Sequence, residues 1–137
     1  MRRERRVLLI EDDAILADLY IRQLRRDGIP LEHVSTGEDA DAFVRDRVPA
    51  LVLADLTLRD TDLQSLIESW AHDPVCAAIP VWILGNTMPD DTTWWHSAPN
   101  VQRYFPKARV VFSRLSREIR ATLGLPYGER IGQRIAG

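Results

Sequence analysis

This sequence has a single cysteine, no long apolar run and no large excess of one charge. Its one cysteine, Cys76, excludes a disulfide within the chain, and no cluster of cysteine and histidine suggests a zinc site. The longest apolar stretches are too short to span a membrane. The 18 Lys and Arg against 20 Asp and Glu give a formal net charge of −2, so no overall field attracts nucleic acid or a membrane. We expect a cytoplasmic protein.

What the 137 residues do contain is a repeated change between strand and helix patterns. Short apolar runs without polar alternation are typical of strands buried on both faces, as in parallel sheets. The expected strands are residues 7–10, 31–35, 50–55, 79–84 and 101–105. Apolar residues at helical spacing between and after them predict five helices, and the fourth, over residues 87–98, has the weakest signal because Thr92, Thr93, Trp94 and Trp95 are poor helix formers.

This alternation predicts an α/β fold, a doubly wound five-stranded parallel sheet with five helices and right-handed crossovers. Asp13 and Thr36 are suited to cap the first two helices, and Leu115, Ile119 and Leu123 mark the buried side of the last one together with Val111 and Phe112. One domain is expected over residues 1–123. The Gly- and Pro-containing tail, 124–137, is expected to be a linker or a loosely held end.

Three acids follow two of the expected strands directly. Glu11 and Asp12 end the first strand and Asp55 ends the third, so all three converge if these strands are neighbours. Like charges that close require a cation between them or raised pKa values. A site of oxygen ligands without a soft donor suits Mg²⁺.

Lys107 follows a further strand end and supplies a positive charge. An acid cluster, a metal and a lysine are what phosphoryl transfer needs, namely positioning and charge neutralisation. The alternative for each residue taken singly is a structural one, with the acids as helix caps and Lys107 as a surface residue.

From residue 7 to about residue 123 the sequence resembles the receiver domains of two-component response regulators, which have a flavodoxin-like fold. The motifs are "VLLIEDD" with the acidic pair, "LVLAD" with Asp55 at the phosphoacceptor position, "IPVWIL" before the switch position, and "YFPK" with Tyr104 at the aromatic switch position and Lys107 at the lysine position.

The resemblance implies a phosphoacceptor domain rather than a classical enzyme. Asp55 would accept a phosphoryl group from a histidine kinase or phosphotransfer protein, with Lys107 beside it. Asp12, Asp55 and the Thr57 carbonyl would bind Mg²⁺, and Glu11 would hold a metal-bound water. An output protein or domain would bind the fourth helix, fifth strand and fifth helix, where Trp94 and Trp95 are either interface residues or one core and one exposed residue. A homodimer is left open, and no direct contact with nucleic acid or a membrane is expected.

Several positions depart from the family pattern. The usual Thr or Ser after the fourth strand is Gly85, so Asn86 or Thr87 would have to supply the missing hydrogen bond to the phosphoryl group. Gly85 also leaves space for Tyr104 to face inward without phosphorylation. Arg59 stands at a usual Pro and Leu63 at a usual Gly.

The lysine position is also atypical, because Ala108 follows Lys107 in place of the usual Pro. We expect a trans peptide bond there and a shifted lysine, because a non-proline cis bond costs about 3–4 kcal/mol. A rival alignment puts Pro106 in that proline's place, which leaves Phe105 at the lysine position and no lysine in the site.

Three functions therefore compete. The first is an atypical receiver that is phosphorylated on Asp55 and signals through protein contacts. The second is a pseudo-receiver that binds partners independently of phosphorylation. The third, more distant, is a phosphatase of the haloacid dehalogenase type, although Thr57 stands where that family needs a second Asp.

Overall fold

The computed structural model describes residues 4–86 and 94–126 and forms a five-stranded parallel sheet. The strand order is β2-β1-β3-β4-β5, and every neighbouring pair is parallel. The strands are β1 (Glu4–Ile10), β2 (Leu31–Val34), β3 (Pro49–Asp55), β4 (Val81–Gly85) and β5 (Val101–Pro106). The predicted α/β fold with a doubly wound parallel sheet is confirmed, and each strand overlaps its predicted range.

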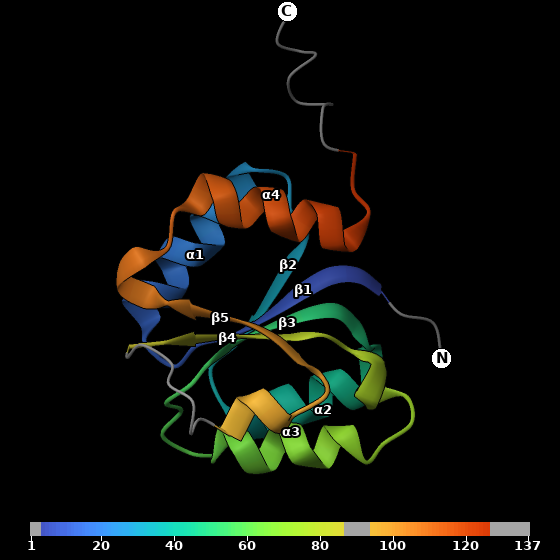
Figure 1. Ribbon diagram of the computed structural model, residues 1–137. Coiled ribbons are helices and arrows are strands. Elements are labelled where there is room, and N and C mark those ends of the chain that lie inside the picture. The colour runs from blue at the N-terminus through green and yellow to red at the C-terminus, as the bar shows by residue number, and fades with distance from the viewer. Residues whose placement is uncertain (1–3, 87–93, 127–137) are drawn as a thin grey trace, which may run out of the picture.

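Four α-helices cover the two faces of the sheet in the part of the chain that is described. They are α1 (Ala14–Arg26), α2 (Gly37–Arg47), α3 (Leu63–Ala71) and α4 (Phe112–Leu123). Figure 1 shows α1 and α4 on one face and α2 and α3 on the other. This three-layer arrangement buries both faces of the central strands, which explains why their sequences are apolar without alternation.

The first three helices begin at side-chain caps. The Asp13 carboxylate accepts hydrogen bonds from the backbone N–H groups of Ile15 and Leu16, and Thr36 accepts one from Asp39. Both caps were expected from the sequence. Asp62 caps α3 in the same way through the N–H of Ser65. These caps satisfy N–H groups that a helix leaves without a partner in its first turn.

The prediction of five helices is corrected to four in the described residues. Residues 87–93 of the expected fourth helix lie outside them, and the rest forms a short 3₁₀ helix, η2 (Trp94–Ser97). Pro99 disfavours the helical conformation for Ala98, so the turn cannot continue. Val111, expected on the buried side of the last helix, is 53% exposed, because it is the residue that precedes α4.

The core forms one cluster on each side of the sheet. Trp70 and Ile67 of α3 lie under one face, and Leu24 of α1 and Ile119 of α4 lie under the other. Cys76 is a buried member of the first cluster, in keeping with a structural residue. Within the described ranges every helix is too short or too polar to cross a bilayer.

Candidate functional site

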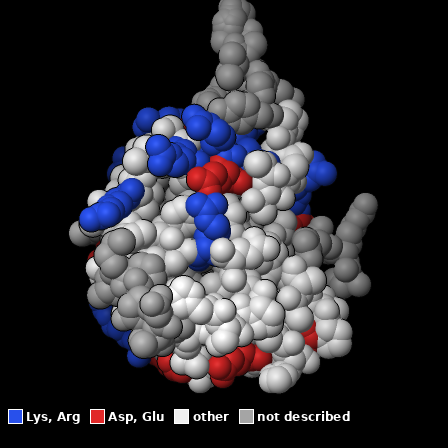
Figure 2. Space-filling model, viewed as in Figure 1, with Lys and Arg blue, Asp and Glu red and all other residues white. Residues whose placement is uncertain are grey.

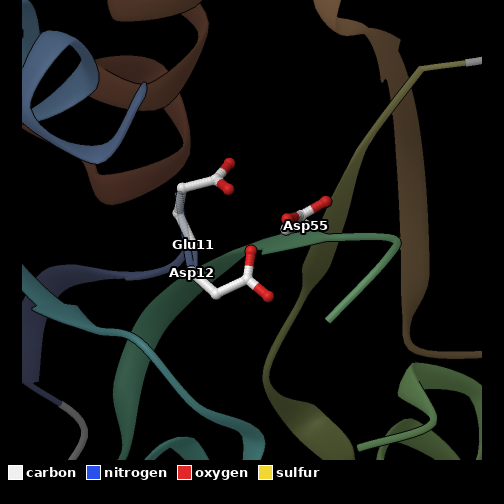
Figure 3. Close-up of side chains that lie close together, drawn as sticks. All are labelled: Glu11, Asp12 and Asp55. Carbon is white, nitrogen blue, oxygen red and sulfur yellow. The ribbon is translucent and has the colours of Figure 1, made fainter. Parts of the chain in front are cut away.

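The acids predicted to converge do so at the carboxyl edge of the sheet. β1 and β3 are hydrogen-bonded neighbours with Ile10 opposite Ala54, so the residues that follow them, Glu11 and Asp55, lie side by side. β2 lies on one side of β1 and β3 on the other, so the strand order reverses at β1, and ligands bind α/β sheets at such a point. Figure 3 shows the carboxyl groups of Glu11, Asp12 and Asp55 gathered there, and one oxygen of each lies within 4.8 Å of the others.

Lys107 places its ammonium group between two of these acids. Its Nζ donates to Glu11 Oε1 at 3.0 Å and to Asp55 Oδ1 at 3.1 Å. All peptide bonds of the described residues are trans, including that to Ala108, as expected. Lys107 nevertheless reaches the site, so the rival alignment that leaves no lysine there is wrong. The short 3₁₀ helix η3 (Lys107–Arg109) follows β5 at once and directs the side chain back to the site.

The innermost acids are almost fully buried, with exposed fractions of 1% for Glu11 and 2% for Asp55. Burial raises the pKa of Glu11 to about 7, and the neighbouring Asp55 contributes to this rise while Lys107 opposes it. Burial alone would lower the pKa of Lys107, but its hydrogen bonds to Glu11 and Asp55 outweigh this and raise its pKa. Lys107 is therefore a permanent cation facing an excess of negative charge.

Asp55 has one oxygen engaged and one available. Its Oδ1 accepts hydrogen bonds from the backbone N–H of Thr57 at 3.1 Å, from the Thr57 hydroxyl at 3.4 Å and from Lys107. No donor among the described residues binds Oδ2. The carboxyl group is thus oriented through one oxygen while the other can react or bind a cation.

Asp12 forms the outer side of the site, and the cavity there has a volume of about 210 Å³. Its side chain is 16% exposed, and its Oδ2 accepts the backbone N–H of Arg59 at 3.0 Å. Thr57, Asn86 and Lys107 also line this cavity. The possible metal ligands are the carboxylate oxygens of Glu11, Asp12 and Asp55, which carry more negative charge than Lys107 balances. Such a set of oxygen ligands fits a hard divalent cation such as Mg²⁺.

The loop between β3 and α3 is held by a residue that the sequence did not identify. The Asp60 carboxylate accepts hydrogen bonds from the backbone N–H of Gly37 at 3.0 Å and of Glu38 at 3.3 Å, at the start of α2. Arg59, seen in the sequence only as a departure from the usual Pro, lines the acid cavity. Its spacing of four residues from Asp55 was the one available signal, whereas nothing in the local sequence indicated the contact between Asp60 and α2.

Gly85 and Tyr104 are in direct contact beside this cavity. A Cβ atom at Gly85 would lie 2.9 Å from the Tyr104 ring atoms Cε2 and Cζ and nearer still to its hydroxyl. The Tyr104 ring also stacks on Trp95, with 4.9 Å between centroids and 9° between planes. The Tyr104 ring therefore packs over Gly85 and is partly buried there. Asn86 is exposed at the cavity, and Thr87 lies outside the described residues.

The two neighbouring tryptophans differ in burial. Trp95 is 8% exposed and belongs to the core, whereas Trp94 is only partly buried at its edge. Their rings contact each other edge to face. An interface role for Trp94 and Trp95 remains a prediction.

Solved structures similar to this one include receiver domains. A Francisella response regulator receiver domain has a TM-score of 0.76 at 17% identity, and the alignment covers 87% of this chain and 96% of that one. The receiver domain of a Syntrophus aciditrophicus signal transduction histidine kinase has a TM-score of 0.73 at 22% identity, with 87% of this chain and 89% of that one covered. A third, from a Pseudomonas aeruginosa sensor histidine kinase, has a TM-score of 0.71 at 18% identity over 87% of this chain and 97% of that one, and holds a magnesium ion in its active-site cleft.

Curated proteins match over part of the sequence. The transcriptional regulatory protein PhoP of Escherichia coli is 30% identical over 79 residues, which are 58% of this chain and 34% of PhoP. PhoP of Salmonella typhimurium is 33% identical over the same extent. The chain spans about a third of the length of these relatives. No family model matches it.

Topology, structural neighbours and partial sequence identity agree with the resemblance drawn from the strand-end motifs. The chain has the fold of response regulator receiver domains, and 58% of its sequence is similar to part of PhoP.

Proposed function

We propose that Asp55 accepts a phosphoryl group from a histidine kinase or phosphotransfer protein, and that this modification is part of a phosphorelay. The observation that carries the proposal is the state of the Asp55 carboxyl group. It is buried, it is held through Oδ1 by Thr57 and Lys107, and its Oδ2 is left without a donor. This arrangement orients a nucleophile, which is one of the main contributions a protein makes to phosphoryl transfer.

In the proposed step Asp55 Oδ2 attacks the phosphorus atom of a phosphohistidine. The new O–P bond forms as the P–N bond breaks, and the electron pair stays on the imidazole nitrogen of the donor. Lys107 lies within hydrogen-bonding distance of Asp55 and stabilises negative charge that collects on the phosphoryl oxygens. Asp12 and Asp55 would hold Mg²⁺ with the Thr57 carbonyl, and Glu11 would bind a metal-bound water. The cation would supply further charge neutralisation.

The direct test is incubation with Mg²⁺ and a small phosphodonor, followed by intact mass measurement. Wild type should gain one phosphoryl group, and Asp55→Asn should gain none. A wild-type mass that does not change, with the fold intact, would contradict the proposal. A phosphatase of the haloacid dehalogenase type is not favoured, because Thr57 has no carboxyl group to act as a general acid.

A second candidate is favoured by the contact between Gly85 and Tyr104. In this alternative the chain is a pseudo-receiver whose output face has one state, because Tyr104 is packed inward without modification. A ligand or modification that does not favour either of two states shifts nothing. The two candidates differ in whether phosphorylation changes the surroundings of Tyr104.

The proposed partner surface consists of η2, β5 and α4, the counterparts of the expected fourth helix, fifth strand and fifth helix. Figure 2 shows Lys and Arg gathered over α4 and β5 around an acidic patch. Arg109 and Arg114 are exposed and form no ion pair with a described residue, and they line a cavity of about 270 Å³ with the exposed Val111. We expect an output partner or domain whose docking segment is acidic. Residues 124–137 would link the domain to such an output domain or form a free end.

A further inference from the structure

The acid cavity has a second positive group at its outer side, Arg59. The backbone N–H of Arg59 donates to Asp12 Oδ2 at 3.0 Å, and the neighbouring Asp60 is bonded to the start of α2. The position of the Arg59 backbone is therefore fixed from both sides. Its side chain is 84% exposed, and its Nε lies 3.9 Å from Asp12 Oδ2, beyond hydrogen-bonding distance. The guanidinium group is thus near the site without being committed to one partner.

The cavity has more negative than positive charge, and a further cation could neutralise part of it. Glu11, Asp12 and Asp55 face Lys107, a partly buried cation. A phosphoryl group on Asp55 would add further negative charge and three acceptor oxygens. Gly85 offers no side-chain donor to them. A guanidinium group binds phosphoryl oxygens with two parallel N–H bonds, which an ammonium group cannot do.

We propose that Arg59 is a cation with two positions in this site. In the unmodified protein it partly neutralises Asp12 and competes with a divalent cation for that carboxylate. Once a cation occupies Asp12 and Asp55 is phosphorylated, like charge repels the guanidinium from Asp12 and the phosphoryl oxygens attract it. Arg59 then takes the place of the side-chain donor that Gly85 lacks. This inference depends on the proposed phosphorylation of Asp55 only for its second position.

The first position is tested by Mg²⁺ titration calorimetry on wild type, Arg59→Ala and Arg26→Ala. Arg26→Ala is the matched control, because it removes the same charge from an exposed arginine in the last turn of α1. We expect Arg59→Ala to bind Mg²⁺ about two- to fivefold more tightly, the range for one exposed charge pair, and the control to bind as wild type does. Measurable binding with equal affinity in all three would overturn the inference. No binding to wild type would contradict the proposed metal site itself.

The second position is tested with beryllium fluoride, a phosphoryl analogue, at saturating Mg²⁺. Loss of a charge-assisted bidentate contact should weaken its binding to Arg59→Ala about tenfold or more. Arg59→Lys should be weakened too, because lysine keeps the charge but cannot donate in a fork. An Arg59→Lys affinity equal to that of wild type would overturn the contact. All variants keep the backbone hydrogen bond to Asp12, and circular dichroism would verify the fold.

Discussion

The Tyr104 ring fills the space over Gly85 that any side chain at that position would need. Trp95 holds the ring from its other side by parallel stacking. Phosphorylation acts on a receiver by shifting populations between two arrangements, and a switch residue must have somewhere to move. Gly85 has no side chain that could block the Tyr104 ring. The ring can therefore pack over Gly85 without any phosphorylation.

We expect Gly85→Thr to force Tyr104 outward. The new side chain would overlap the ring, and such overpacking costs about 1–3 kcal/mol. Tryptophan fluorescence should change because the stack on Trp95 is lost, and beryllium fluoride should alter this signal more than it does in wild type. In a Tyr104→Ala background the same substitution should cost much less. Equal costs in the two backgrounds, measured by urea unfolding, would mean that the residues are not coupled.

The charge excess in the acid cavity has a consequence for stability. With EDTA at pH 7.5, Asp12→Asn should raise the free energy of unfolding by up to about 1 kcal/mol, because it removes one of the acids that repel each other. The asparagine can still accept the N–H of Arg59. The gain should shrink with salt, and Mg²⁺ should stabilise wild type more than the variant.

The control for this measurement is Asp62→Asn, which also removes one acid and keeps a side-chain cap on its helix. We expect it to change stability little. A loss of stability in Asp12→Asn alone would show that the carboxylate holds the loop through its hydrogen bond and that repulsion is minor.

Stability should fall with pH through the range in which Glu11 titrates. Its pKa is raised from 4.5 in the unfolded chain to about 7 in the fold, so the folded state holds this proton more tightly. The stabilisation is complete below about pH 4.5 and is lost as pH rises through about 7. The free energy of unfolding of wild type minus that of Glu11→Gln should therefore decrease from pH 4.5 to 7.5. A difference independent of pH would place the pKa of Glu11 near its ordinary value.

Sequence patterns predicted most of the sheet and the acids because these depend on local features. Apolar runs that end in carboxylates identify strands, and parallel strands bring their carboxyl ends to one edge, so Glu11 and Asp55 could be placed together from the sequence. The reach of Lys107 could not, because Ala108 left open the path of the chain after β5. The contact of Asp60 with the start of α2 joins loops that are 23 residues apart, and no local pattern encodes it.

Lys107 is expected to be the residue on which the apo site depends most. Its removal leaves Glu11 and Asp55 buried without a cation, and breaking a buried ion pair in this way costs about 3–5 kcal/mol when the remaining charge cannot be neutralised. Here it can be neutralised in part, since the pKa of Glu11 is already about 7 and rises further without the lysine. Lys107→Met should therefore be destabilised strongly at pH 8 and clearly less at pH 6, measured by urea unfolding in EDTA. Adding Glu11→Gln should recover much of the loss at pH 8, because Asp55 then has no charged neighbour at that side. An equal loss at both pH values, or a double variant no more stable than Lys107→Met, would show that the lysine acts through packing of its side chain and that the two acids do not interact across the site.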